Sequence, residues 1–267
     1  MASAQKFQGQ PSVVAVGGID PEGGAGLFRD VATARGLGAR VRAVGTAWTE
    51  QGSGAHRVEP RAPAAVRDAL SRALAELRPQ SVKIGMAVRP ATARALIAAL
   101  ARFRGAVVVD PVLATSRGGA LWSARPAALL PLLRLATLVT PNAPEAAALA
   151  GRPVKTPADA AAAGRALVDD HGLAAVLVKG GHIRERGRAA RKVVMDVLVT
   201  PSSTTWLVRP KVSGPSPRGT GCALATAIAV ALGRGEPLAS AIAGAADWLA
   251  AAIETAQRVG RERHLGH

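Results

Sequence analysis

The chain lacks tyrosine and has only three phenylalanines and four tryptophans. Surfaces that bind RNA or single-stranded DNA stack bases on aromatic side chains that are interleaved with basic residues. Here Phe103 is the only aromatic residue flanked by basic residues, Arg102 and Arg104. The shortage of aromatics therefore argues against nucleic acid as the partner, in spite of a net charge of +16.

Lysine and asparagine are also scarce. Of the 34 basic residues, 28 are arginine and six are lysine, and they are spread over the whole chain. Asn142 is the only asparagine. This pattern indicates a drift of composition towards Arg and Ala, whereas a dedicated anion-binding surface would concentrate the charge on one element.

Cys222 is the only cysteine, so the chain forms no internal disulfide. No apolar run reaches the roughly 18 residues that a membrane span needs. The N-terminal segment also lacks the charged and apolar regions of a secretory signal. We therefore expect a cytoplasmic protein with no membrane partner.

The sequence is rich in hydrophobic residues, at 49% of 267. Short β-branched runs alternate with longer Ala- and Leu-rich stretches of helical period, which is typical of βαβ units and a largely parallel sheet. We predict one α/β domain over residues 11–257, a three-layer α/β/α sandwich, with flexible tails at 1–10 and 258–267. The predicted strands are Ser12 to Val16, Arg40 to Thr46, Ser81 to Met86, Ala106 to Asp110, Ala136 to Thr140, Ala174 to Lys179, Val193 to Val199 and Thr205 to Val208. The predicted helices are Gly24 to Leu37, Ala62 to Leu77, Pro90 to Phe103, Ala124 to Leu133, Ala143 to Ala150, Pro157 to His171, Gly221 to Leu232 and Pro237 to Thr255.

A glycine-dense turn, Gly17 to Gly26, follows the first predicted strand, and Asp30 lies one helical turn further on. Ligands of doubly wound sheets bind outside the carboxyl ends of the strands, so this position is informative. The spacing is not the G-x-G-x-x-G of a dinucleotide site, and the absence of a Gly-Lys pair excludes a Walker A loop. The turn either brings its backbone close to a small ligand or serves packing alone.

Other strand ends carry polar or charged residues. Gln51 follows the second strand, where its amide can pair with a heterocycle. Lys83, in the third strand, is either a site residue or a solvated cation, and Asp110 ends the fourth. Lys179 ends the sixth strand, where a lysine can meet a nucleotide phosphate.

The fifth strand is followed by Asn142 and Glu145 at the start of a helix. Asn is a good N-cap, and Glu three residues later completes a capping box, so a structural role explains the pair. However, an amide beside a carboxylate at a strand end also suits hydrated Mg²⁺. Because Asn142 is the only asparagine of the chain, we favour a role in holding Mg²⁺ through water.

The segment Gly219, Thr220, Gly221 and Cys222 leads into an apolar helix. Glycines there let successive N–H groups turn inward at the helix N-terminus and form an anion hole for a phosphoryl group. In the first helical turn, the Cys222 thiol is expected to have a lowered pKa and to favour the thiolate. The alternative is a small, buried and inert cysteine.

Taken in order, six segments resemble the ribokinase-like superfamily, and within it the hydroxymethylpyrimidine and phosphomethylpyrimidine kinases of thiamine biosynthesis. The segments are Gly18 to Gly26, Lys83 to Met86, Asp110 to Val112, Thr140 to Glu145, Lys179 to His182 and Gly219 to Cys222. These kinases carry Cys where most of the superfamily has an Asp base, and this chain has Cys222. The resemblance spans about Ser12 to Ile253 and implies a ribokinase-like fold and a homodimer.

The resemblance also implies roles for individual residues. ATP would place its phosphates near Lys179 and the anion hole of Gly219, Thr220 and Gly221, with Mg²⁺ at Asn142 and Glu145. The hydroxymethyl oxygen of the acceptor would approach Cys222, so that Cys222 and Lys179 are the implied catalytic residues. The pyrimidine would contact Gly18, Asp30, Gln51, Met86 and Val112.

Three features depart from the family. The family commonly has His where Arg218 stands, and the arginine would place positive charge beside the phosphates, supporting transfer to a phosphorylated substrate or altering specificity. Arg117 interrupts a Ser-Gly stretch, and residues 184–192 form a strongly basic segment, either a solvated loop or a phosphate flap. Two other functions therefore stay open: a pyridoxal or pyridoxine kinase on the same scaffold, and a non-catalytic ligand-binding relative.

Overall fold

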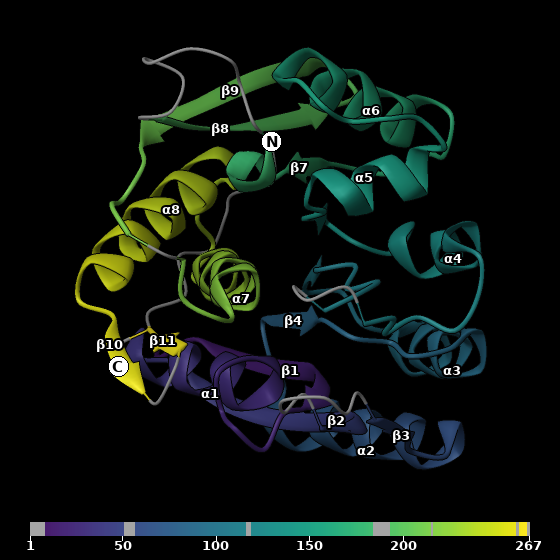
Figure 1. The fold of residues 1–267 in the computed structure, drawn as a ribbon. Coiled ribbons are helices and arrows are strands. Elements are labelled where there is room, and N and C mark those ends of the chain that lie inside the picture. The colour runs from purple at the N-terminus through teal and green to yellow at the C-terminus, as the bar shows by residue number, and fades with distance from the viewer. Residues whose placement is uncertain are drawn as a thin grey trace.

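The computed structural model describes residues 9–50, 57–115, 119–183, 193–214, 216–259 and 262–265. Its main sheet consists of β1 Ser12–Ile19, β2 Arg40–Glu50, β3 Arg57–Pro60, β4 Ser81–Ile84, β5 Ala106–Val109, β6 Leu138–Val139, β7 Val176–Val178, β8 Val193–Thr200 and β9 Ser203–Pro210. The strand order is β3-β2-β1-β4-β5-β6-β7-β8-β9 (Figure 1). The strands from β2 to β7 in this order are parallel, and β3, β8 and β9 pair antiparallel at the two edges. The predicted α/β class and largely parallel sheet are confirmed.

Helices cover both faces of the sheet (Figure 1). One face carries α1 Gly26–Gly36, α7 Thr220–Gly233 and α8 Leu238–Glu254. The other carries α2 Pro63–Leu77, α3 Pro90–Leu100, α4 Leu130–Leu133, α5 Ala143–Ala150 and α6 Pro157–Asp169, together with the 3-10 helix η1 Pro126–Leu129. A second 3-10 turn, η2 Gly180–His182, follows β7.

Neighbouring residues of the central strands pack into two different hydrophobic clusters. Val108 and Leu177 face the layer of α1, α7 and α8, whereas Val109 and Val178 face the layer of α2 to α6. The strand pleat turns successive side chains to opposite faces, so a continuous apolar strand needs cover on both sides. This packing explains why the buried strands read as unbroken Val, Ala and Leu runs.

Local sequence signals fix several helix starts. Pro63, Pro90 and Pro157 lie in the first turn of their helices, where the missing N–H has no intrahelical partner to lose. Thr156 and Asp159 form a reciprocal capping box at the start of α6. By contrast, the predicted helix from Ala124 to Leu133 divides into η1 and α4, and Pro131 within it lacks the donor that a continuous helix would need.

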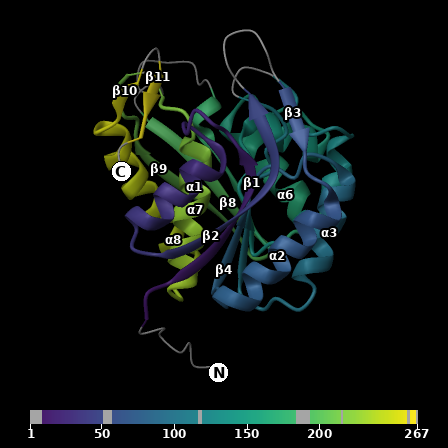
Figure 2. The ribbon, with the colours of Figure 1, turned by 90° about the horizontal axis from the view of Figure 1, so that it is seen from below.

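The C-terminal end differs from the flexible tail that the sequence suggested. β10 Gln257–Val259 and β11 Glu262–His264 form a hairpin, and Leu265 is buried in the cluster of α7 and α8. The buried Arg29 guanidinium donates to the Leu265 carbonyl at 3.2 Å. Figure 2 shows the hairpin at the same end of the molecule as β3. A single apolar residue in a charged segment gives no periodic signal, which is why the sequence did not predict this contact.

Among the described residues, no helix combines the length and the apolar character that crossing a membrane requires.

Leu138 and Leu135 offer a matched test of the packing. Leu138 has no exposed surface, whereas Leu135 is 43% exposed. We expect Leu138→Ala to lower the free energy of unfolding by about 2–5 kcal/mol because it leaves a cavity in the hydrophobic cluster under α1, α7 and α8. Leu135→Ala should change it by less than about 0.5 kcal/mol. Urea denaturation measures both, and equal losses would contradict the placement of Leu138 in the core.

Candidate active site

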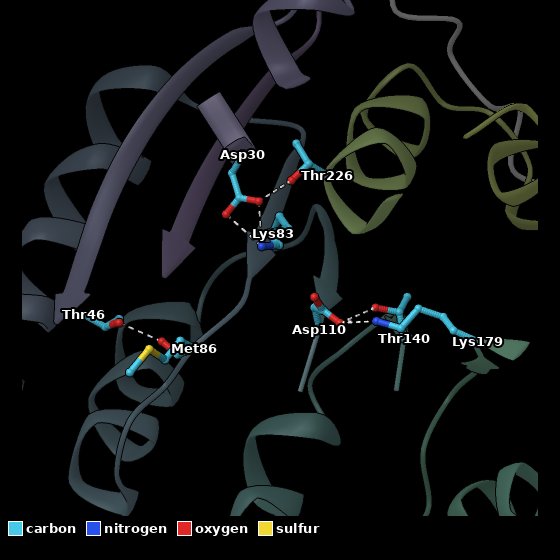
Figure 3. Close-up of polar contacts among 8 residues, drawn as sticks. All are labelled: Asp30, Thr46, Lys83, Met86, Asp110, Thr140, Lys179 and Thr226. Carbon is cyan, nitrogen blue, oxygen red and sulfur yellow. Dashed lines mark hydrogen bonds and ion pairs between the residues drawn. The ribbon is translucent and has the colours of Figure 1, made fainter. Parts of the chain in front are cut away.

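The carboxyl ends of β5, β6 and β7 bring charged residues to one edge of the sheet. Lys179 Nζ donates to Asp110 Oδ1 at 2.7 Å, and the Thr140 hydroxyl donates to the same oxygen at 3.3 Å (Figure 3). Asn142 and Lys179 pair as neighbours through a parallel bridge. The sequence predicted Lys179 and Asn142 at this edge but missed Asp110 as the partner of the lysine. The sequence signal that could have identified Asp110 is the position of an acidic residue directly after a run of valines.

Lys179 keeps its positive charge in this setting. Burial alone would lower the pKa of its ammonium, but the carboxylates of Asp110 and Glu145 raise it above the ordinary lysine value. A largely buried cation at a strand end is therefore available to a phosphate group.

Helix α7 begins directly beside this ion pair. Gly219 has a φ of +76°, and a Cβ there would lie 2.3 Å from the Gly24 carbonyl oxygen, so the position requires glycine. A Cβ on Gly221 would lie 3.2 Å from Lys179 Nζ and 3.6 Å from Asp110 Oδ2. The N–H groups of the first turn have no partners within the helix, so this helix end carries partial positive charge. It lies next to the lysine ammonium. The structure thus brings the predicted anion hole and Lys179 together.

Cys222, in the first turn of α7, has the opposite pKa shift from the expected one. Burial raises the pKa of its thiol to about 11, with Lys83 opposing the rise and Asp30 and Asp110 adding to it. The Gly26 backbone N–H also opposes the rise. The prediction of a thiolate is therefore wrong, because desolvation outweighs the helix end and the nearby cation.

Lys83 is not a solvated cation. Its side chain is 1% exposed, and Nζ donates to both carboxylate oxygens of Asp30 at 2.8 Å (Figure 3). The Thr226 hydroxyl of α7 donates to Asp30 Oδ1 at 2.9 Å. Burial alone would lower the pKa of Lys83, but Asp30 and the nearby Cys222 raise it, so the lysine is charged. A direct contact of Asp30 with a ligand stays a prediction, since its carboxylate already accepts from Lys83 and Thr226.

Three of the residues predicted to contact the pyrimidine lie together at the carboxyl ends of the central strands. Met86 and Val112 belong to one small apolar cluster, and a Cβ on Gly18 would lie 2.8 Å from Met86 Sδ. The Thr46 hydroxyl fixes the Met86 backbone by donating to its carbonyl at 2.7 Å (Figure 3). Gln51 lies outside the described residues, as do Arg117 and the basic segment 184–192, so the predictions made for them are untested.

Asn142 and Glu145 form the capping box of α5. Asn142 Oδ1 accepts from the Glu145 N–H at 2.9 Å, and Glu145 Oε2 accepts from the Asn142 N–H at 2.8 Å. Burial raises the pKa of the Glu145 carboxyl to about 7, and Lys179 opposes this rise while Asp110 adds to it. The two residues therefore cap α5, as the structural explanation predicted. The Glu145 carboxylate also interacts electrostatically with Lys179 and Asp110.

Arg218 pairs with carboxylates that the sequence did not indicate. Its guanidinium donates to Asp20 Oδ2 at 3.0 Å and to Glu22 Oε2 at 2.6 Å. Both carboxylates belong to the glycine-dense turn after β1. The extra positive charge is thus paired with protein carboxylates in this structure.

Comparison with solved structures defines the class of the fold. The Staphylococcus aureus pyridoxal kinase in complex with AMP-PCP and pyridoxal superposes with a TM-score of 0.85 at 24% identity, over 97% of this chain and 94% of that one. A phosphomethylpyrimidine kinase from Clostridium difficile has a TM-score of 0.75 at 26% identity, over 91% of this chain and 100% of the other. The fold is ribokinase-like.

Sequence comparison is more specific. The chain is 35% identical over 249 residues to the hydroxymethylpyrimidine/phosphomethylpyrimidine kinase of Rhizobium meliloti, covering 92% of this chain and 91% of that protein. It is 38% identical over 259 residues to a thiamine biosynthesis bifunctional protein of Geobacter sulfurreducens, of which it spans 50% of the length. Residues 20–266 match the phosphomethylpyrimidine kinase family, and the chain belongs to this family of kinases.

The raised thiol pKa can be tested because Cys222 is the only cysteine. The thiolate is the reactive form, so alkylation by iodoacetamide should stay slow at pH 7–9 and rise with a midpoint near about 11. Mass spectrometry of the intact protein over a pH series, at constant ionic strength, measures the rate. A midpoint at or below the ordinary cysteine value would show that the helix end and Lys83 outweigh burial.

Proposed function

We propose that the protein is an ATP-dependent kinase that phosphorylates 4-amino-5-hydroxymethyl-2-methylpyrimidine, and then its monophosphate, in thiamine biosynthesis. The proposal rests on one juxtaposition: the Lys179 ammonium lies beside the N-terminus of α7, whose first turn carries Cys222. The choice of substrate is supported by relatives of 30–38% identity named as kinases of this pyrimidine or as thiamine biosynthesis proteins.

Phosphoryl transfer requires alignment of donor and acceptor and neutralisation of the charge on the transferred group. Lys179 and the N–H groups of Gly219 to Cys222 are positioned to meet that charge. Asp110 orients the Lys179 ammonium, so the lysine would not need to reorient during the reaction. The apolar surface of Met86 and Val112 suits the flat ring of a pyrimidine.

Mg²⁺ fits the donor set of this edge. Among the described residues no group of three or more His, Cys, Asp or Glu side chains forms a metal cage. Mg²⁺ in kinases is usually held by one or two carboxylates, water and the nucleotide phosphates, and does not need such a cage. Glu145, with Asn142 beside it, would hold the ion through water, and Mg²⁺ would there neutralise phosphate charge.

In the proposed reaction Cys222 would receive the proton of the acceptor hydroxyl, but its high pKa limits this role. With a pKa of about 11, only about 10⁻⁴ of the thiol is ionised at pH 7. Charge stabilisation by Lys179 and the anion hole therefore contributes more to the rate than the base does.

The function is tested by incubating the purified protein with the hydroxymethylpyrimidine, ATP and Mg²⁺, with pyridoxal in a parallel reaction, and weighing the products by mass spectrometry. We expect the pyrimidine monophosphate and then the diphosphate. A preference for pyridoxal of tenfold or more in kcat/KM would replace the proposed substrate, and no product from either would favour the non-catalytic alternative.

The ranking of the two catalytic residues gives a further prediction. Lys179→Met should lower kcat by about 10²–10³-fold, because the lysine meets charge that develops in the transition state. Cys222→Ala should lower kcat less than Lys179→Met at pH 7 and leave the KM of the pyrimidine nearly unchanged. Steady-state kinetics at saturating ATP measure both variants.

Lys155→Met is the matched control, because Lys155 is exposed before α6. It should retain the wild-type kcat. A larger loss from Cys222→Ala than from Lys179→Met would contradict the proposed ranking.

A further inference from the structure

Arg218 connects two loops that lie far apart in the sequence. It immediately precedes the anion hole, and its guanidinium reaches Asp20 and Glu22, which lie 198 and 196 residues earlier. The Arg218 side chain is 14% exposed and that of Asp20 is 2% exposed. One guanidinium thus holds two carboxylates of the turn from Asp20 to Gly26, which suits its planar, multidentate geometry.

The backbones of the same two loops are also in close contact. A Cβ on Gly219 would lie 2.3 Å from the Gly24 carbonyl oxygen, so there is no room for one. The Arg218 N–H donates to the Arg263 carbonyl at 3.1 Å, and a Cβ on Gly24 would lie 3.2 Å from the His264 ring. The C-terminal hairpin therefore supports both loops from outside.

The same turn lies beside the start of α7, whose first turn carries Cys222. The turn ends at Gly26, where α1 begins, and a Cβ on Gly219 would lie 3.2 Å from the Ala25 Cα. Gly26 has a φ of +60°, and a Cβ there would lie 2.4 Å from the Gly18 carbonyl oxygen. The turn is thus in close contact both with the start of α7 and with the backbone of Gly18 on the predicted acceptor side.

We propose that Arg218 is a positioning residue, which ties the Asp20 to Gly26 turn to the anion hole and so aligns the acceptor with the phosphoryl group. The inference rests on the proposed kinase function and concerns the same site. It differs from the expectation that the guanidinium binds a substrate phosphate, because two protein carboxylates occupy it in the structure.

The test uses Asp20→Asn, which acts on the opposite end of the contact. Asp20 Oδ1 accepts from the Glu22 N–H within the turn, whereas Oδ2 accepts from Arg218. An asparagine that keeps Oδ1 in place preserves the turn and presents an NH₂ group to the guanidinium. Asp20→Asn should therefore have the same kind of effect as Arg218→Ala if the contact itself matters, and no larger one, because the Arg218–Glu22 ion pair remains.

We expect each variant to lower kcat by about tenfold or more, by the same factor for the neutral pyrimidine and for its monophosphate, with small changes in KM. The kcat of the double variant should fall no further than that of Arg218→Ala, and Arg218→Lys should recover part of the loss.

Arg42→Ala, which breaks the exposed Arg42–Glu76 pair, is the control and should leave kcat unchanged. A rise in KM confined to the monophosphate in Arg218→Ala, with Asp20→Asn near wild type, would overturn the proposal in favour of a direct phosphate contact.

Hydrogen exchange gives a readout that does not need activity. Arg218→Ala and Asp20→Asn should each speed exchange in the peptide covering residues 20–27 by about tenfold or more, with α6 unchanged as the internal reference. Unchanged exchange in this peptide would contradict the proposal that Arg218 holds the turn in place. If the wild-type protein phosphorylates neither acceptor, the proposed function fails, while the exchange result still decides whether Arg218 holds the turn.

Discussion

Two buried lysine–carboxylate pairs beside the N-terminus of α7 are the constraint on which the site depends. Lys83 pairs with Asp30, and Lys179 pairs with Asp110, at distances of 2.8 and 2.7 Å. A buried charge is expensive without a partner, so each lysine is stable at the sheet edge only with its carboxylate in place. Both ion pairs lie beside the start of α7, which is the helix end that carries partial positive charge.

The same pairs set the chemistry of Cys222. Lys83 favours the thiolate, but the carboxylates that keep the lysines buried disfavour it, and the protein around the sulfur adds the largest opposing effect. An environment of buried lysine–carboxylate pairs is therefore not one that produces a strong base at Cys222. Catalysis that relies on charge neutralisation tolerates this outcome, because the metaphosphate-like transition state needs little help from a base.

Sequence reasoning was successful where the signal is local. The predicted α5 has the bounds of the observed helix, since Asn142 and Glu145 cap it and Gly151 ends it in the left-handed region. The parallel topology followed from runs such as Ala106 to Val109, and it placed Asn142 and Lys179 at one edge. The partners of the charged residues were not predictable in this way. Asp30 and Lys83 lie 53 residues apart, and nothing in either segment indicates that they meet.

The pKa of Cys222 was predicted wrongly because the prediction considered the residue, its own helix and nearby cations, whereas burial by the surrounding protein raises the pKa most, and Asp30 and Asp110 add to the rise. The partners of Arg218, Asp20 and Glu22, likewise come from another segment, and the sequence did not indicate them. Asp20 shows how these segments depend on one another. Burial raises the pKa of its carboxyl while Arg218 lowers it, so the arginine stabilises the charge that organises the turn. An arginine next to the predicted anion hole is therefore compatible with phosphoryl transfer, because its charge is paired with the carboxylates of the turn after β1.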